Sequence, residues 1–150
     1  MKTIIKNLEI QSAAFASNGH VPSKYTCDGE NVNPPLEISD IPEDTKSLAL
    51  IVEDPDAPGG LFIHWLLWNL SPDEQIPERT NEGVSGINDF GRTGYGGPCP
   101  PSGTHHYHFK IYALDMELHL TAGENRAALL ESMNGHVLAE GELIGRYKKK

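Results

Sequence analysis

Four polar side chains of this 150-residue sequence lie inside apolar stretches. Asp54 ends the stretch SLALIVED, His64 lies within LFIHWLLWNL, and His105 and Tyr107 lie near the start of THHYHFKIYAL. Burying a polar group costs free energy unless the group is hydrogen-bonded. We therefore expect the four side chains to meet around one pocket, where each can find a partner.

The expected pocket favours a bound oxyanion. Two imidazoles and a phenol can donate hydrogen bonds, and a carboxylate can hold one imidazole in a fixed orientation. Donors in a small, half-dry cleft suit phosphate or carboxylate. The loop GGPCPPSG, residues 96–103, precedes the third stretch, and its glycine N–H groups could add further donors.

A metal site is the first alternative. His105, His106 and His108, together with Asp54, carry suitable ligand atoms. A cupin-like site needs a further acid and a distant histidine, which the sequence lacks at suitable spacing. The His-Glu-x-x-His and Cys-x-x-Cys motifs are also missing from the sequence. We therefore expect neither a metal nor another cofactor.

Catalysis is the second alternative. The sequence contains no Gly-x-Ser-x-Gly motif, and Cys99 stands between prolines with no helix N-terminus to activate its thiol. Asp54 and His64 could serve in general acid–base chemistry, although the sequence identifies no nucleophile. The first expectation is therefore a non-enzymatic binding protein, and the alternative is metal-assisted or acid–base hydrolysis in the same pocket.

Each apolar stretch is predicted to be a β-strand. The first, residues 47–54, stops at Pro55, which cannot continue a ladder of hydrogen bonds. The second, residues 61–70, has proline and glycine on its flanks, and the third, residues 104–114, is rich in aromatic residues. Asp56, in the run DPDAP between the first two strands, is expected to form a turn by bonding nearby backbone.

Side chains alternate between the two faces of a strand, so their parity assigns each residue to a face. Parity places His64 on the face that carries Leu66 and Trp68. In the third strand it places Tyr107 on the apolar face and His106 on the polar face. We expect His106 to point away from the pocket.

The whole sequence predicts a mainly β architecture. Many strands and one late helix favour a two-sheet β-sandwich with Greek-key connections and one or two short helices near the C-terminus. The long irregular segment at 71–103 is expected to be functional, because such loops are uncommon in compact domains. The other predicted elements are a first strand within residues 1–18, a short strand at 36–38, a helix capped by Thr121 and Glu124 and ended by Gly135, and a short strand at 142–144.

Length and charge argue against several classes of protein. The chain length fits one domain, residues 1–150. With 21 acidic against 12 basic residues the net charge is −9, so neither nucleic-acid binding nor stable membrane association is expected. The sequence has no apolar stretch long enough to span a membrane and no signal-peptide apolar region, so we expect a cytoplasmic protein.

The two cysteines, Cys27 and Cys99, do not amount to a disulfide framework. In a reducing cytoplasm both are expected to be thiols, and a pairing between them, more common in hyperthermophiles, is the alternative. The strand at 61–70 is apolar on both faces, which would allow a homodimer. A second sheet of the same chain would cover that strand equally well.

Several separated motifs resemble the phosphatidylethanolamine-binding protein (PEBP) family. They are DPDAP at 54–58, the pair His64-Trp65, GGPCPPSG at 96–103 and the run His105-His106-Tyr107. The segments YTCDGENVNPPLEI and NDFGRTGYGGPCPP resemble its prokaryotic branch, the Raf kinase inhibitor-like (YbhB/YbcL) proteins. The resemblance extends from about residue 10 to the C-terminus.

This resemblance implies an antiparallel two-sheet Greek-key sandwich with a helix near its end. It also implies an anion pocket for phosphate or a phosphoryl head group, and a protein that binds a phosphorylated small molecule or the phospho-group of a protein. Regulation of a kinase or protease partner is a further implication. The family usually has arginine where this chain has His106. The pocket residues that the resemblance implies are Asp54, His64, Gly97, Pro101, His105 and Tyr107.

Overall fold

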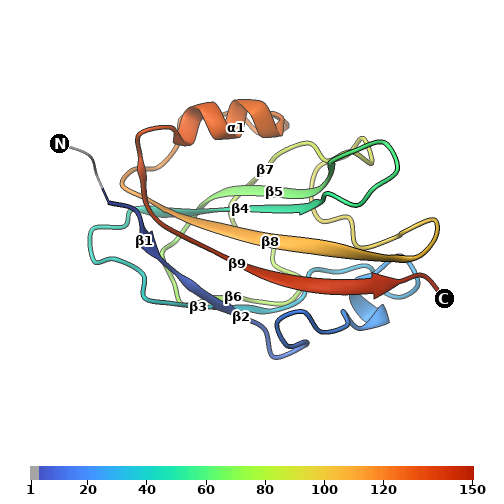
Figure 1. Cartoon of the computed structure of the whole chain (residues 1–150). Coiled ribbons are helices and arrows are strands. Elements are labelled where there is room, and N and C mark those ends of the chain that lie inside the picture. Colours follow the sequence, from blue (N-terminus) through green and yellow to red (C-terminus); the bar gives the residue numbers. More distant parts are fainter. Residues whose placement is uncertain (1–3) are drawn as a thin grey trace.

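The computed structural model describes residues 4–150 (Figure 1). The part of the first predicted strand that falls on residues 1–3 lies outside this range. Within it, the chain forms nine β-strands, one 3₁₀-helix and one α-helix. The elements are β1 (Lys6–Asn7), β2 (Glu9–Gln11), η1 (Ser23–Tyr25), β3 (Leu36–Ser39), β4 (Ser47–Asp54), β5 (Phe62–Leu70), β6 (Gln75–Ile76), β7 (Val84–Ser85), β8 (Thr104–Leu114), α1 (Arg126–Met133) and β9 (Val137–Lys148).

The strands of residues 4–150 form two sheets, which confirms the predicted mainly β sandwich. The larger sheet has the order β1-β9-β8-β4-β5-β7, and the smaller has the order β2-β3-β6. Neighbouring strands pair antiparallel except β1 and β9, which are parallel. This order is consistent with Greek-key connections.

The larger sheet is covered on both faces. One apolar cluster fills the space between the two sheets and includes Ile38 of the smaller sheet and Leu50 and Trp65 of the larger one. A second cluster lies between the larger sheet and α1, which packs over β4 and β5 in Figure 1, and it includes Trp68 and Leu129. Because Trp65 and Trp68 are both buried within the chain, the apolar strand gives no argument for a homodimer.

Two β-bulges in β5 change the face that its side chains present. Val52 pairs with Trp65 while the next residue of β4 pairs with Ile63, so His64 is the extra residue of the first bulge. The second bulge surrounds Asn69, whose φ is +56°. Bulges re-aim side chains near functional sites. His64 therefore points toward the inter-sheet side.

The prediction that His64 shares a face with Leu66 and Trp68 is wrong because of the first bulge. Leu66 and Trp68 pack under α1, whereas the His64 ring lies 5.2 Å from the ring of Tyr107, which belongs to the cluster between the sheets. Simple alternation fails here because it assumes a strand without inserted residues.

The first and last predicted strands differ from the structure in length. The N-terminal segment divides at the buried Leu8 between β1 of the larger sheet and β2 of the smaller one. The short strand predicted at 142–144 is the middle of β9, which pairs with β8 along its length. Gly141 and Gly145 interrupt the apolar pattern of β9 because a Cβ at either would collide with Leu8 or Val21.

The helix begins later than predicted. Its N-cap is Asn125, whose side-chain oxygen accepts the N–H of Ala128 at 2.9 Å, so the proposed cap at Thr121 is wrong. The apparent capping pair Thr121 and Glu124 lies in the loop before the helix. Gly135 follows the helix with a φ of +84°, as expected of a residue just beyond a helix C-terminus.

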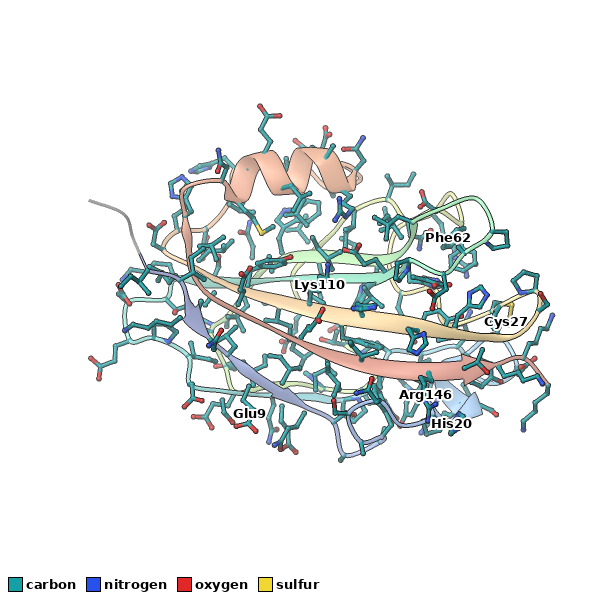
Figure 2. All side chains as sticks on the ribbon, viewed as in Figure 1. Glu9, His20, Cys27, Phe62, Lys110 and Arg146 are labelled. Atoms are coloured by element: carbon teal, nitrogen blue, oxygen red, sulfur yellow. A yellow bond between two sulfur atoms is a disulfide. The ribbon has the colours of Figure 1, made fainter. Side chains whose placement is uncertain are left out.

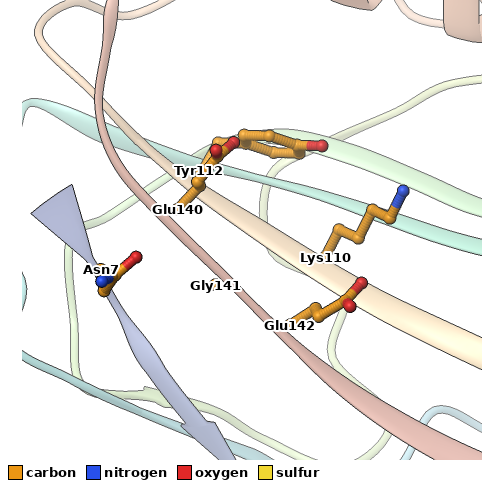
Figure 3. A pocket seen from close by; sticks show the side chains of 6 residues that line it. All are labelled: Asn7, Lys110, Tyr112, Glu140, Gly141 and Glu142. Carbon is orange, nitrogen blue, oxygen red and sulfur yellow. The ribbon is translucent and has the colours of Figure 1, made fainter. Parts of the chain in front are cut away.

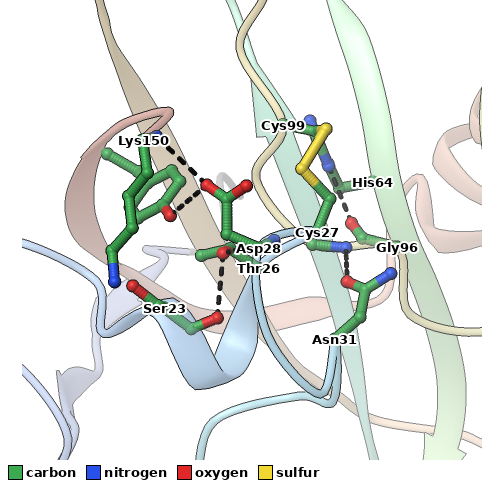
Figure 4. The surroundings of a disulfide bond; sticks show 11 residues. Ser23, Thr26, Cys27, Asp28, Asn31, His64, Gly96, Cys99 and Lys150 are labelled. Atoms are coloured by element: carbon green, nitrogen blue, oxygen red, sulfur yellow. Dashed lines mark hydrogen bonds between the residues drawn. A yellow bond between two sulfur atoms is a disulfide. The ribbon is translucent and has the colours of Figure 1, made fainter.

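The prediction of two thiols is wrong, because Cys27 and Cys99 form a disulfide (Figure 4). The bond joins the segment after η1 to the loop at 96–103, across 72 residues of sequence. Two hydrogen bonds support the same junction: the N–H of Cys27 donates to the Pro98 carbonyl, and the N–H of Gly97 donates to the Asn31 side chain. The sequence separation of the two cysteines does not show whether the fold brings them within bonding distance.

Removing this disulfide should destabilise the fold. Closing a loop of about 70 residues restricts the unfolded chain by about 4 kcal/mol on the loop-entropy model. We expect the variant with Cys27→Ala and Cys99→Ala to lose up to that amount in a urea unfolding titration. Dithiothreitol should lower the stability of the parent protein and leave the variant unchanged. Equal stability of the parent and the variant would contradict a structural role for the bond.

Candidate functional site

A cavity of about 400 Å³ lies at one end of the larger sheet, where β4 ends and β5 and β8 begin. Figure 2 labels Phe62 and Cys27 at this end of the molecule. The cavity is mostly apolar around a few polar groups, as is usual for ligand sites. Its lining residues are Asp54, Ala57, Pro58, Phe62, His64, Asp89, Phe90, Cys99, Pro100, Pro101, His105 and Tyr107.

The buried carboxylate of Asp54 organises the floor of this cavity. Its Oδ2 lies 2.6 Å from Nδ1 of His105, and both side chains are more than nine-tenths buried. Its Oδ1 accepts the backbone N–H of Asp56 at 2.7 Å and so forms the turn after β4. Because the ionised carboxylate only accepts, Nδ1 of His105 carries the hydrogen, and its Nε2 is left for a ligand.

Asp56 has a different role from the one predicted. Asp54 forms the local turn, and Asp56 reaches across to β8, where its Oδ2 accepts the backbone N–H of His106 at 2.8 Å. The same oxygen lies 2.8 Å from Nδ1 of the His106 ring. These hydrogen bonds lower the pKa of Asp56. His106 is exposed, as predicted, and two neighbouring Asp–His pairs attach the loop after β4 to β8.

His64 is buried beside the cavity with its ring among aromatic neighbours. Its Nδ1 lies 2.7 Å from the carbonyl oxygen of Gly96, so Nδ1 must be the donor. The ring lies 5.0 Å from Phe62 and 5.4 Å from Phe90, measured between ring centroids. Burial lowers the pKa of His64 below its usual 6.5, with the Gly96 carbonyl opposing part of the effect. At neutral pH the ring is therefore uncharged.

Tyr107 carries a polar atom whose hydrogen bond is missing. The residue is fully buried, and although the backbone N–H of Cys99 approaches the hydroxyl oxygen, the hydroxyl hydrogen has no acceptor among residues 4–150. Burial raises the pKa of Tyr107, and the nearby charge of Asp54 adds to this effect, so the hydroxyl stays protonated. An unpaired buried hydroxyl costs about 1–3 kcal/mol. A donor in this state, lining a cavity, points to a ligand.

The loop at 96–103 contributes the wall of the cavity through its prolines. Pro101 lines the cavity, in agreement with its expected place, but Gly97 is not among the lining residues. The N–H of Gly97 donates to Oδ1 of Asn31 at 2.8 Å, and a Cβ here would collide with the Tyr25 carbonyl. Gly97 thus positions the loop by close packing.

Sequence reasoning missed the aromatic and acidic residues of the long segment before this loop. Phe90 and Asp89 line the cavity, and Oδ2 of Asp89 accepts the N–H of Ile63 at 2.7 Å. Both belong to the motif NDFGRTGYGG that carried part of the family resemblance. The motif itself is the sequence signal that contains these two cavity residues.

A second cavity, of about 340 Å³, opens on the outer face of the larger sheet (Figure 3). Lys110, Glu140 and Glu142 surround it, and Lys110 also lies 3.5 Å from the buried Glu53. Its charges are of both signs and it contains no orphaned buried donor among the described residues that line it. The cavity beside Tyr107 is the better candidate.

The described residues give no support to the metal alternative. No group of three or more His, Cys, Asp or Glu side chains among residues 4–150 is arranged to hold a metal ion. His105 pairs with Asp54, whereas His106 pairs with Asp56 and His108 pairs with a glutamate of β9. Alternation along β8 sends these rings to opposite faces of the sheet.

Comparisons with known proteins agree on one family. The family model described as phosphatidylethanolamine-binding protein matches residues 11–148. A UPF0098 protein of Pyrococcus horikoshii is 49% identical over 150 residues, which cover 93% of this chain and 76% of that protein. The crystal structure of a PEBP homologue from Chlamydia trachomatis has a TM-score of 0.93 and 43% identity, covering 97% of this chain and 99% of the other. Escherichia coli YbcL, described as a member of the mammalian PEBP family, has a TM-score of 0.87 and 31% identity, covering 96% and 99%.

The lowered pKa of His64 predicts how one histidine affects stability with pH. In the unfolded chain the His64 ring is protonated near pH 6.5, whereas in the folded chain it is protonated only at lower pH. The free energy of unfolding therefore falls as the pH drops below 6.5. We expect His64→Asn, which retains a donor for Gly96, to reduce the loss of stability between pH 7.5 and pH 5.5 by about 1 kcal/mol. Urea unfolding at both pH values measures this difference.

The exposed His119 provides the matched control for this experiment. His119→Gln should leave the pH dependence of stability as it is in the parent protein. An identical pH dependence in the parent and in His64→Asn would show that the folded chain does not hold the His64 ring neutral.

Proposed function

Because this chain belongs to the phosphatidylethanolamine-binding protein family, we propose that it is a non-enzymatic protein that binds a phosphate-like anion in the cavity beside Tyr107. The ligand would be a phosphorylated small molecule or the phospho-group of a protein. The single observation that carries this proposal is Tyr107, a buried residue that lines the cavity and whose hydroxyl hydrogen has no acceptor among the described residues.

Three groups would contact the anion. Tyr107 donates its hydroxyl hydrogen, and His105 presents Nε2 while Asp54 holds its Nδ1. His64 presents Nε2 while the Gly96 carbonyl holds its Nδ1. In their neutral forms both rings offer a lone pair at Nε2, so binding a fully ionised anion requires that they take up protons. Anion binding is therefore coupled to protonation of the two imidazoles.

Binding is favoured over hydrolysis by the state of the groups that could act as nucleophile or base. Cys99, which lines the cavity, is held in the disulfide and is not a thiolate. Asp54 holds His105 and the Asp56 N–H, and the described lining residues include no serine, threonine or free thiol that could serve as a nucleophile. Hydrolysis in the same cavity is the alternative, and release of phosphate from a phosphomonoester would support it.

Partners and location belong to the proposal as well. A phospho-group carried by a protein would make the cavity a docking point for a kinase or protease partner, as the resemblance implies. Among residues 4–150 no helix is long and apolar enough to cross a membrane. We retain a cytoplasmic location as part of the proposal. The Cys27–Cys99 disulfide restricts the cytoplasmic proposal to the cytoplasm of a hyperthermophile, because cytoplasmic disulfides are rare in other organisms.

Tyr107→Phe separates a binding role from a structural one. Removing a hydroxyl whose hydrogen has no acceptor in the protein should leave the free energy of unfolding unchanged or raise it by up to about 1–3 kcal/mol. Loss of the donor should weaken binding of inorganic phosphate by about tenfold or more, measured by isothermal titration calorimetry. Tyr112→Phe is the control, since that hydroxyl lies at the other cavity. Unchanged phosphate affinity in Tyr107→Phe would sink the site assignment.

The coupling to protonation predicts the pH dependence of binding. Sulfate is the suitable probe because its charge does not change between pH 8 and pH 6. Since His64 has a lowered pKa, few rings are charged at pH 8, and we expect sulfate affinity to rise several-fold as the pH falls to 6. Calorimetry in buffers of different ionisation enthalpy should show proton uptake. Affinity that stays constant with pH would contradict a role for the imidazoles.

A further inference from the structure

The candidate anion site has an unusual electrostatic composition. Neither lysine nor arginine occurs among its lining residues, all of which lie within the described part of the chain. Two carboxylates, Asp54 and Asp89, line it, and the His64 ring is uncharged at neutral pH. A dianionic ligand would therefore enter a cavity without a permanent positive charge. Protons taken up by the two imidazoles on binding would be offset by the charges of Asp54 and Asp89, so a dianionic ligand would gain from a further cation at the cavity mouth.

Arg92 is the cation placed to supply that charge. Its guanidinium carbon lies 5.7 Å from the centre of the Phe90 ring, in cation–π contact. Phe90 lines the cavity, is 41% exposed, and has its ring 5.4 Å from the His64 ring. The Phe90 ring thus contacts both the guanidinium of Arg92 and the ring of His64.

The guanidinium of Arg92 is also free to take a ligand. No carboxylate of residues 4–150 pairs with Arg92, whereas Arg79 pairs with Glu30 and Arg126 pairs with Glu53. Arg146 also lacks a carboxylate partner, but its Nε donates to the Asn18 carbonyl, whereas the Arg92 side chain makes no hydrogen bond among residues 4–150. Its contact with Phe90 holds it near the cavity without satisfying its N–H donors.

The backbone that carries Arg92 is held in place. The buried Asn88 uses its Oδ1 to accept the N–H groups of Phe90, at 2.9 Å, and Arg92, at 3.3 Å. Its own N–H donates to the Arg92 carbonyl, and its side-chain amide donates to Gly94. A φ of +82° at Gly91 permits this tight turn. The loop is therefore fixed while the side chain of Arg92 stays exposed.

We propose that Arg92 is a ligand-binding residue which closes over the cavity mouth and selects phosphate monoesters. This rests on the proposed function of the cavity. The guanidinium makes charge-assisted hydrogen bonds to the phosphoryl oxygens that face the mouth. A phosphodiester presents two non-bridging oxygens and one negative charge to the guanidinium and the donors of the cavity. A monoester presents three such oxygens and a second negative charge, which suits the added cation.

The test compares two probes that differ in one ester bond, phosphoethanolamine as the monoester and glycerophosphoethanolamine as the diester. Calorimetry on the parent protein should show tighter binding of the monoester. Arg92→Ala should weaken monoester binding about tenfold and reduce the preference over the diester. Arg92→Lys should retain part of the affinity, because a single ammonium replaces a two-pronged donor. Arg79→Ala, which removes an arginine already paired with Glu30, is the matched control.

The outcomes separate this inference from the proposal on which it rests. Equal monoester affinity in the parent and in Arg92→Ala, or no preference for the monoester in the parent, would overturn the role of Arg92 and leave the anion site standing. Failure of the parent to bind phosphoethanolamine, inorganic phosphate and sulfate alike would overturn the proposed function and the Arg92 role together. Because Arg92 is exposed, unfolding midpoints of the variants should match the parent.

Discussion

The contact between Asp54 and His105 is the constraint on which the site depends. The antiparallel register of β4 and β8 runs from Ser47 opposite Leu114 to Glu53 opposite His108, so the next step brings the end of β4 beside the start of β8. Asp54 is 2% exposed, and an unpaired charge at that depth would be strongly destabilising. Pairing with His105 satisfies one oxygen, and the turn after β4 satisfies the other.

The fold can support an unsatisfied donor because its core is large on both faces of the main sheet. β4 is buried along its whole length, between the smaller sheet on one side and α1 on the other. The cost of leaving the Tyr107 hydroxyl unpaired, about 1–3 kcal/mol, is small against the burial of those two apolar clusters. The site therefore lies at the edge of the deeply buried main sheet, whose strands β4, β5 and β8 position its donors.

Strong local patterns were predictable from the sequence, and local exceptions were not. β4, β5 and β8 follow from apolar runs bounded by proline and glycine, and parity places Asp54, His105 and Tyr107 on one side correctly. Parity fails at His64 because a bulge adds one residue to β5, which no propensity signals. The disulfide and the contact of Asp56 with β8 each join segments that are far apart in the sequence. The local residue pattern does not show that such segments meet.

The negative charge of the whole molecule does not favour an anion at long range, so any binding of an anion depends on the geometry of the groups at the site. A net charge of −9 repels anions at a distance, yet at physiological salt that repulsion is screened beyond about 8 Å. Within that range a ligand meets few groups: the oriented rings of His64 and His105, the Tyr107 hydroxyl, and the guanidinium on Phe90. Under the proposed function, short-range hydrogen bonds in this mostly apolar cavity would be the dominant favourable interaction, because their strength grows as a ligand excludes water. Under the proposed function, such a pocket would gain affinity from fixed donors and from protons taken up on binding, rather than from an extended positively charged surface.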